Sequence, residues 1–419
     1  MHALNRWILI ACALTACKKH DESLAKPSDR EADFAAQLKT AIGRDLTFDE
    51  ANHRLTGSNE AISTTNLYQE WVATAPADRP EAIKKIAAGF AQAHGDTADA
   101  AKVRPQLRPA VRAVSYFDPS QITRLAAGMG SAASTTKIPF VALGAGAGAA
   151  VAIDSPDSMS IATDKQLADW KMSIDDALAI AVTNLRADGA HLEQLEPGVW
   201  GAKTGDSYDA SRIVLVDDIR KLNLPGGAVA LIPNRETLLL AGAKDARGLL
   251  AMAARAEAVE ADPRPIHTVA LCLGDAGWSD CVPDVTPEVQ NKFSELAARG
   301  WISLYGDTHD AYQDELGDDL FVAHLAGMKK QGGVSVSYAT WTKTVPTMLP
   351  KADLIAFVVL EGPEGKEKGK MLGLARWDRV MAAFGSHLKE TGRLPRYWAT
   401  GDWFPSDAEL AKLPLEQKP

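Results

Sequence analysis

This sequence of 419 residues lacks an excess of basic side chains, a second long hydrophobic run and a nucleotide-binding motif. Its 45 lysines and arginines are outnumbered by 54 aspartates and glutamates, which gives a net charge of -9. Because nucleic-acid phosphates need a basic face, this balance argues against a nucleic-acid partner. After the N-terminal segment, no run is long and apolar enough to span a membrane. The absence of a Walker loop, a dinucleotide fingerprint and a supported Ser/His/Asp set favours a non-catalytic protein without a cofactor.

Cysteine is also scarce, and the first two of the four lie in an N-terminal segment that resembles a secretory signal. After Arg6, Trp7–Ala16 is nearly all apolar over roughly ten residues, about half of what a spanning helix needs. The sequence Leu14-Thr-Ala-Cys17 resembles the lipobox of bacterial lipoproteins. The resemblance implies cleavage after residue 16 and a diacylglycerol on the sulfur of Cys17. The alternative is an N-terminal helix with an incidental cysteine.

The segment after Cys17 is polar and predicts a flexible tether over residues 17–32. Such a composition cannot bury enough apolar surface to fold alone. Several acyl chains at Cys17 would give a stable membrane anchor. By analogy with lipoprotein sorting, Lys18 points to the outer membrane. We therefore expect a lipid-anchored protein of the bacterial cell envelope that faces the periplasm.

The remaining cysteines are Cys272 and Cys281, in "CLGDAGWSDC". Because the periplasm is oxidising, a disulfide between them is expected, the alternative being two free thiols. The spacing excludes a Cys-x-x-Cys redox motif, and no histidine lies in the loop to favour a metal site.

The order of apolar patterns predicts two folded domains in the mature chain of roughly 400 residues. In the first, residues 33–282, hairpins alternate with helices, which is typical of an α+β fold with a mainly antiparallel mixed sheet. The second, residues 283–419, is predicted to be a smaller α/β or α+β domain. It begins with a helix that Thr286 caps and Gly300 closes, followed by a strand over residues 301–305.

Several segments of the first domain share their order and spacing with a known family. They include "LTFDEANHRL", "RPAVR", "AVAID" before "LADW", "AVTNLRA", and "YDASRI" before "VALIPNRETLLLAG". Over residues 35–272 the chain therefore resembles the YtpQ-like family of bacterial proteins of unknown function. The family offers no catalytic residues to carry over. The lipoprotein signal and the C-terminal domain of this chain depart from its pattern, which puts a shared cytoplasmic role in doubt.

One pair of short motifs suggests chemistry. Ser134-Thr-Thr-Lys137 and the later Lys203-Thr-Gly205 are similar to marks of penicillin-binding proteins and serine β-lactamases. However, "KIPFVAL" after Ser134 indicates a strand where those enzymes need a helix. The gap between the motifs is too short for their helical subdomain, and no Ser-Asp-Asn lies between them. An envelope hydrolase using Ser134 and Lys137 is kept as the alternative function.

The first candidate ligand surface is "DSYDASR", which places Ser207, Tyr208, Asp209 and Arg212 close together. Asp209 and Arg212 have the groups to orient a polar ligand. The alternative, which we favour, is that Asp209 caps the next turn and Arg212 pairs with it or with Asp217.

The second candidate surface is "RYWATGDWFP", with Tyr397, Trp398 and Trp403. Exposed rings of this kind stack on sugars or contact proteins. The favoured alternative is that they hold the C-terminal segment on the second domain.

The acidic stretch around His309 favours a solvated loop over a cation site, because its spacing matches no known ligand loop. No metal site is therefore predicted. The sequence as a whole favours a non-catalytic binding or scaffolding lipoprotein with an envelope protein or a glycan as its partner.

Overall fold

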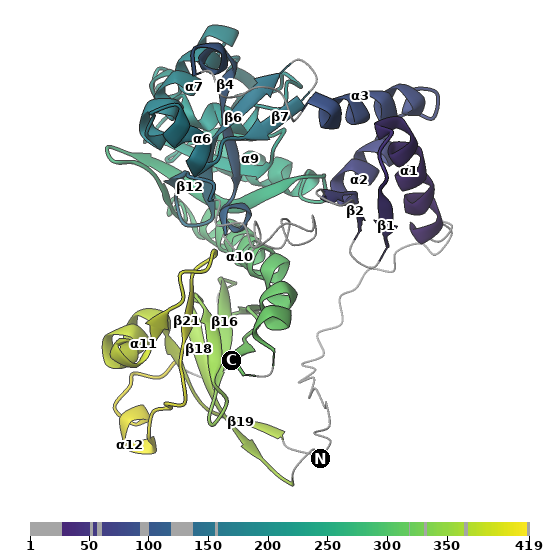
Figure 1. Cartoon of the computed structure of the whole chain (residues 1–419). Coiled ribbons are helices and arrows are strands. Elements are labelled where there is room, and N and C mark those ends of the chain that lie inside the picture. The colour runs from purple at the N-terminus through teal and green to yellow at the C-terminus, as the bar shows by residue number, and fades with distance from the viewer. Residues whose placement is uncertain are drawn as a thin grey trace. The chain divides into compact units, whose positions relative to one another are not determined.

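The computed structural model describes residues 27–50, 53–56, 61–92, 100–118, 137–155, 158–317, 319–330, 333–363 and 368–416. The chain is α+β, with 39% helix, 30% strand and mostly antiparallel sheets, as the sequence predicts. It divides into an N-terminal unit, residues 26–304, and a C-terminal unit, residues 305–419 (Figure 1). The division lies inside the long helix α10 (Pro287–Leu316), whereas the sequence predicts a boundary between residues 282 and 283, before that helix. Cys17, Cys12 and Ser134 lie outside the described residues.

The N-terminal unit begins with three helices and a small sheet. The helices are α1 (Pro27–Ile42), α2 (Thr65–Ala73) and α3 (Arg79–Gln92), and the antiparallel strands are β1 (Thr47–Asp49), β2 (Arg54–Thr56) and β3 (Ala61–Ser63). Phe34, Leu38 and Leu55 form their core. The predicted tether, residues 17–32, ends in helix, because α1 begins at Pro27. A proline is tolerated there since the first turn needs no N–H donor.

A second sheet of the N-terminal unit has the order β4-β6-β5, with β7 also paired to β6. Its strands are β4 (Leu107–Ala113), β5 (Val141–Leu143), β6 (Ala147–Ser155) and β7 (Ser158–Ile161). Figure 1 shows α6 (Asp164–Asp169) and α7 (Ile174–Asp188) beside this sheet. Ser173 and Asp176 form a capping box that starts α7. Short turns flank β4: α4 (Ala100–Val103), η1 (Arg104–Gln106) and η2 (Val114–Phe117).

The largest sheet is antiparallel and has the order β13-β12-β10-β11-β9-β8. Its strands are β8 (Glu193–Glu196), β9 (Val199–Ala202), β10 (Ala228–Asn234), β11 (Leu238–Gly242), β12 (Pro265–Gly274) and β13 (Gly277–Asp280). Every residue of β10 and β11 is buried. Alternate residues face opposite ways along a strand, so Val229 and Leu231 pack with α9 (Ala246–Ala258), while Ala230 and Ile232 pack with the second sheet. Before β10 lie η3 (Ala210–Val214) and α8 (Val216–Arg220).

Cys272 on β12 and Cys281, just after β13, form the predicted disulfide. Their sulfur atoms are 2.08 Å apart. The bond closes the β12–β13 hairpin at its open end. Among the described residues, no helix is both long and apolar enough to cross a membrane.

The helix predicted to end at Gly300 continues without a break as α10 (Pro287–Leu316), so the predictions of a strand at residues 301–305 and of an acidic loop around His309 are wrong. The reason is close packing. A methyl group on Gly300 would lie 2.6 Å from Oγ1 of Thr268. Glycine is needed where the helix approaches β12 and does not terminate it.

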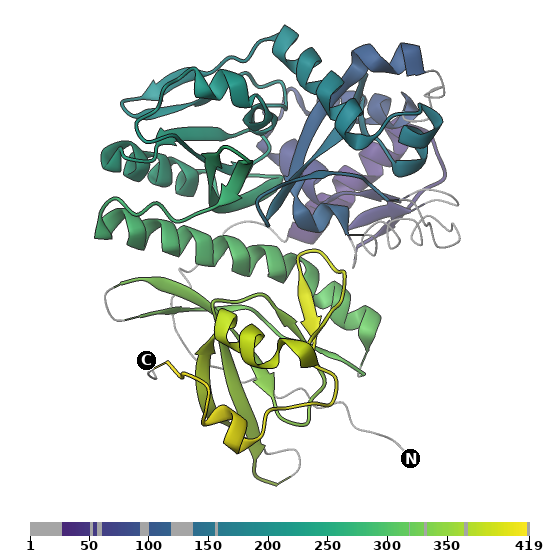
Figure 2. The same cartoon turned by 90° about the vertical axis from the view of Figure 1, so that its left-hand side faces the viewer.

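The C-terminal unit contains two four-stranded mixed sheets, ordered β14-β17-β21-β20 and β15-β16-β18-β19 (Figure 2). The β14–β17 and β16–β18 pairs are parallel and the others antiparallel. The strands are β14 (Phe321–Val322), β15 (Ala326–Lys329), β16 (Ser335–Thr342), β17 (Thr347–Pro350), β18 (Leu354–Glu361), β19 (Lys368–Arg376), β20 (Lys389–Glu390) and β21 (Tyr397–Ala399). The helices are α11 (Trp377–Phe384), η4 (Gly385–His387) and α12 (Asp407–Leu410).

Candidate functional site

The "DSYDASR" segment, residues 206–212, leads from the loop after β9 into η3, and its polar contacts converge on Arg212 within η3. The Arg212 side chain is fully buried. Its Nη2 lies 2.7 Å from Oδ2 of Asp206, and its Nη1 lies 3.0 Å from Oδ1 of the same carboxylate. Asp209 accepts a third, longer contact of 3.4 Å from Nη1. Arg212 therefore pairs with the acids of its own turn, whereas Asp217 pairs with Arg186.

Asp209 is at the N-cap position of η3, but its side chain makes no cap hydrogen bond to that turn, so the predicted capping is absent. Its carboxylate is 2% exposed and accepts hydrogen bonds from the backbone N–H and the hydroxyl of Thr204, at 3.0 and 2.7 Å. Burial by itself raises the pKa of Asp206, but the hydrogen bonds from Arg212 and from the Tyr208 N–H lower it to about 2. These contacts fix the backbone that presents Ser207 and Tyr208.

Ser207 and Tyr208 connect this turn to two other strands. Ser207 has a φ of +70°, which is uncommon for a residue other than glycine. Its hydroxyl accepts a 3.1 Å hydrogen bond from Nη2 of Arg235, the residue after β10. Tyr208 is buried, and its pKa is raised by that burial and by the nearby carboxylate of Asp154 on β6. Burial also raises the pKa of Asp154.

Arg112, on β4, lies near the same turn without a carboxylate of its own. Burial lowers its pKa, and the charge of Arg235 lowers it further. Its Nη1 donates to the Val111 carbonyl at 2.8 Å, and its Nη2 lies 3.6 Å from the sulfur of Met159. Among the described residues no acid is within ion-pair distance of it. We call Arg112, Arg235, Ser207 and Tyr208 the arginine site.

Two acidic residues near the arginine site form ion pairs with Arg235 and with the neighbouring Arg264. Arg235 contacts Glu236 at 2.8 Å, and Arg264 forms an ion pair with Glu70 on α2. Burial raises the pKa of Glu70, and Arg235 partly offsets that rise. Arg264 also has a positive φ, of 63°, and its carbonyl accepts the Arg235 N–H at 3.1 Å. Within the described part of the chain, Arg112 is thus the cation of this neighbourhood that has no ion pair, and the more distant charge of Glu236 raises its pKa only in part.

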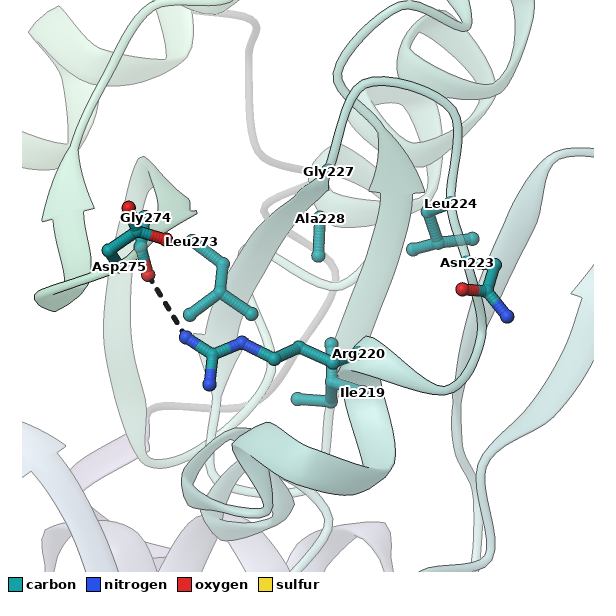
Figure 3. A pocket seen from close by; sticks show the side chains of 9 residues that line it. All are labelled: Ile219, Arg220, Asn223, Leu224, Gly227, Ala228, Leu273, Gly274 and Asp275. Carbon is teal, nitrogen blue, oxygen red and sulfur yellow. Dashed lines mark hydrogen bonds between the residues drawn. The ribbon is translucent and has the colours of Figure 1, made fainter.

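A separate hollow of about 300 Å³ lies at the other end of β10 (Figure 3). It is lined by residues of α8, of the turn before β10 and of the β12–β13 hairpin: Ile219, Arg220, Asn223, Leu224, Gly227, Ala228, Leu273, Gly274 and Asp275. No feature of the sequence pointed to it, because its walls come from three segments that are distant along the chain.

The aromatic residues of the second candidate surface lie in the packing of the C-terminal unit. Tyr397 is fully buried and Trp398 is 6% exposed. Trp398 packs on Trp377, with ring centroids 4.8 Å apart. Trp403 is partly buried and stacks on His387 at 3.8 Å. Of the three, Trp403 is the ring that solvent reaches most easily.

Of the two residues named for the alternative hydrolase, the structure describes only Lys137. Ser134 is outside the described residues. Lys137 is exposed in an extended segment before β5, and its N–H donates to Asp164 at 3.1 Å. Within the described part of the chain, no group of three or more His, Cys, Asp or Glu side chains could hold a metal ion.

Sequence reasoning identified the turn around Arg212 but missed Arg112 and Arg235 as its neighbours. Arg112 ends the "RPAVR" segment, and an arginine inside a strand was a usable signal. Arg235 lies in an ordinary hairpin turn, and nothing local marks it. No family model matches this chain, and no curated protein or solved structure matches it either.

Proposed function

We propose that this chain is a lipid-anchored, non-catalytic binding protein of the bacterial cell envelope, and that its N-terminal unit binds the oxyanion of a ligand at the arginine site. The observation that carries the proposal is Arg112, a partly buried guanidinium whose contacts are a carbonyl and a thioether sulfur. The YtpQ-like resemblance and the envelope location are parts of the same proposal. The Cys272–Cys281 disulfide supports an oxidising compartment.

The physical argument starts from the cost of burying charge. Removing an ion from water costs several kcal/mol unless an opposite charge and hydrogen bonds replace the water. Arg212, nearby, is fully buried and has two carboxylates around it. Arg112 has none within ion-pair distance in the described part of the chain, and a thioether is a weak acceptor. Its planar fork suits the two oxygens of a phosphate or a carboxylate.

Arg235 is the second cation of the arginine site. Its charge is close enough to Arg112 to lower the pKa of Arg112. Two cations that repel each other in the empty protein would both be stabilised by one anion. Ser207 adds a hydroxyl beside Arg235. Because both arginines extend from strands or their ends, the anion would meet a preorganised site.

The test is isothermal titration of the full chain with inorganic phosphate and, separately, with acetate at low ionic strength. We expect binding of at least one anion, and a loss of about tenfold or more in Arg112→Gln, since hydrogen bonds to charged groups contribute about 1.5–3 kcal/mol. The matched control is Arg247→Gln, because Arg247 is exposed on α9. Equal anion affinity in Arg112→Gln and the parent would contradict the site.

The alternative function is an envelope hydrolase that uses Ser134 and Lys137. Its test is labelling with a fluorescent penicillin and with a fluorophosphonate. Labelling that disappears in Ser134→Ala would overturn the non-catalytic proposal, whereas an unlabelled protein would support it.

A further inference from the structure

The hollow at the start of β10 is an enclosure of small-molecule size. Its volume of about 300 Å³ is at the lower end of the usual range for ligand pockets. Figure 3 shows α8 on one side of it, the Gly227–Ala228 turn above it and the tip of the β12–β13 hairpin opposite. It is distinct from the arginine site, because Ala228 begins β10 and Arg235 follows its last residue.

The floor of the hollow is apolar. Ile219 is 1% exposed and Ala228 6%, and both belong to the core between the two large sheets. Leu224 and Leu273 pack against the same core and are only partly buried. These two leucines therefore present apolar surface to the hollow that the fold does not fully cover.

The mouth of the hollow carries Arg220, which has no acidic partner among the residues that the structure describes. Nη2 of Arg220 donates to the Gly274 carbonyl at 3.3 Å, across the hollow (Figure 3). The nearest acids in sequence are already engaged. Asp218 binds Arg186 and Lys221, at 2.8 and 2.7 Å, and Asp217 also contacts Arg186.

Asp275 lines the hollow, but among the described residues it has no basic group within ion-pair distance. The guanidinium of Arg220 has five N–H donors, and its hydrogen bond to the Gly274 carbonyl uses one of them, so most of them are available to a ligand.

Two glycines and the disulfide shape the walls of the hollow. Gly226 and Gly227 have φ values of 80° and 92°, so they take a turn that other residues rarely adopt. A side chain on Gly227 would have a single neighbour within 4 Å, the Leu273 carbonyl, at 3.9 Å. Glycine thus keeps the space open. The opposite wall is the hairpin that the Cys272–Cys281 disulfide closes.

We propose that this hollow binds a small carboxylate with a short apolar chain. Its carboxylate lies on the Arg220 guanidinium, and its chain covers Leu224 and Leu273 on the floor. The Asn223 amide lies at the rim, where it lines the same hollow. This site is independent of the arginine site, so the chain carries two places for anionic groups, one at each end of β10.

The experiment uses the full chain and two probes, octanoate and its uncharged counterpart octanol. Both are titrated by isothermal calorimetry and by saturation-transfer NMR. We expect octanoate to bind and octanol to bind at least about tenfold more weakly, since a charge-assisted hydrogen bond contributes about 1.5–3 kcal/mol. Equal affinity for the two probes, or no octanoate binding at millimolar concentration, would overturn the proposal.

Two variants localise the binding. Arg220→Gln should lose about tenfold or more of the octanoate affinity, while Arg247→Gln, an exposed arginine on α9, should keep it. Ala228→Leu places a larger side chain into the hollow and should abolish binding of octanoate without touching Arg220.

Circular dichroism verifies that each variant is folded, and the Arg220→Gln result stands even if Ala228→Leu is not. Arg112→Gln leaves the hollow intact, so unchanged octanoate binding there separates this site from the arginine site. Unchanged octanoate affinity in Arg220→Gln would contradict the assignment of the ligand carboxylate to Arg220.

Discussion

At the scale of single residues, the turn around Arg212 is the strongest electrostatic feature of the N-terminal unit. Arg212 is fully buried between Asp206 and Asp209, whose side chains are 38% and 2% exposed. Removing one partner of a buried pair leaves a charge without compensation. We therefore expect Arg212→Met to lower the free energy of unfolding by about 3–5 kcal/mol. Urea unfolding followed by circular dichroism measures the loss.

The control for this prediction is Arg186→Met. Arg186 is 42% exposed and pairs with Asp218 at 2.8 Å on the surface. Exposed pairs contribute about 0–1 kcal/mol, because water screens them. If Arg186→Met and Arg212→Met lower the free energy of unfolding equally, burial does not make the Arg212 ion pairs more important for stability than the exposed pair.

His267 predicts a pH dependence of stability. It lies on β12, 5% exposed, and neither ring nitrogen has a hydrogen-bond partner among the described residues. Burial lowers its pKa to about 3. In the unfolded chain the pKa is about 6.5, so below that pH only the unfolded state gains a proton. Stability contributed by neutral His267 is therefore lost as the pH falls from about 6.5 towards 3.

The expected size is a loss of about 2 kcal/mol between pH 7 and pH 5, since each unit of pKa difference corresponds to about 1.4 kcal/mol. His267→Leu keeps the side chain apolar and removes the titration. The unfolding free energy of the parent minus that of His267→Leu should therefore decrease as the pH falls, because only the parent loses this stability. Parallel pH profiles for the two proteins would show that His267 is protonated in the folded state.

At the scale of elements, α10 offers a matched pair of glycines. Alanine stabilises a helix interior by about 1 kcal/mol relative to glycine. At Gly306 a methyl group would meet nothing within 4 Å, so Gly306→Ala should raise the free energy of unfolding by about that amount. At Gly300 the methyl group would lie 2.6 Å from Thr268 Oγ1.

That hydroxyl is held by its 3.0 Å hydrogen bond to the Leu296 carbonyl, so it cannot easily move away. Overpacking of this kind costs about 1–3 kcal/mol. Gly300→Ala should therefore destabilise the protein in the same urea experiment. A stabilising Gly300→Ala would mean that the contact between α10 and β12 is looser than the structure shows.

The same helix shows which elements the sequence could predict. Local patterns predicted the alternation of hairpins and helices in the first domain and the start of α10 after Thr286, because turn residues, caps and periodicity are local signals. A glycine at position 300 is consistent with a helix end or with a close approach of the helix to another element, and only the contact with Thr268 decides between the two. Because Gly300 was taken as the end of the helix, the second half of α10 was predicted to be a strand and a loop.

At the scale of the whole molecule, the binding sites could be predicted only in part. The turn around Arg212 was visible because its polar residues are contiguous in the sequence. Arg112 and Arg235 are more than a hundred residues apart, and the packing of the sheet that holds β4 on the sheet that holds β10 brings them near each other. The hollow at Arg220 needs three separate segments. Neither arrangement leaves a local pattern, since both depend on how the sheets pack.

The proposed attachment of the whole protein to a membrane depends on Cys17, which the structure does not describe. If Cys17 is acylated, cells grown with an alkyne-labelled fatty acid should yield labelled protein, and Cys17→Ala should lose that label. Cys12→Ala is the matched control, because Cys12 belongs to the predicted signal segment and not to the predicted acylation site, and it should keep the label. The acyl label decides the matter more sharply than fractionation, since an uncleaved signal would also hold the variant at the membrane. A Cys17→Ala protein that still carries the label would refute the lipid anchor, and the envelope location would then rest on the Cys272–Cys281 disulfide alone.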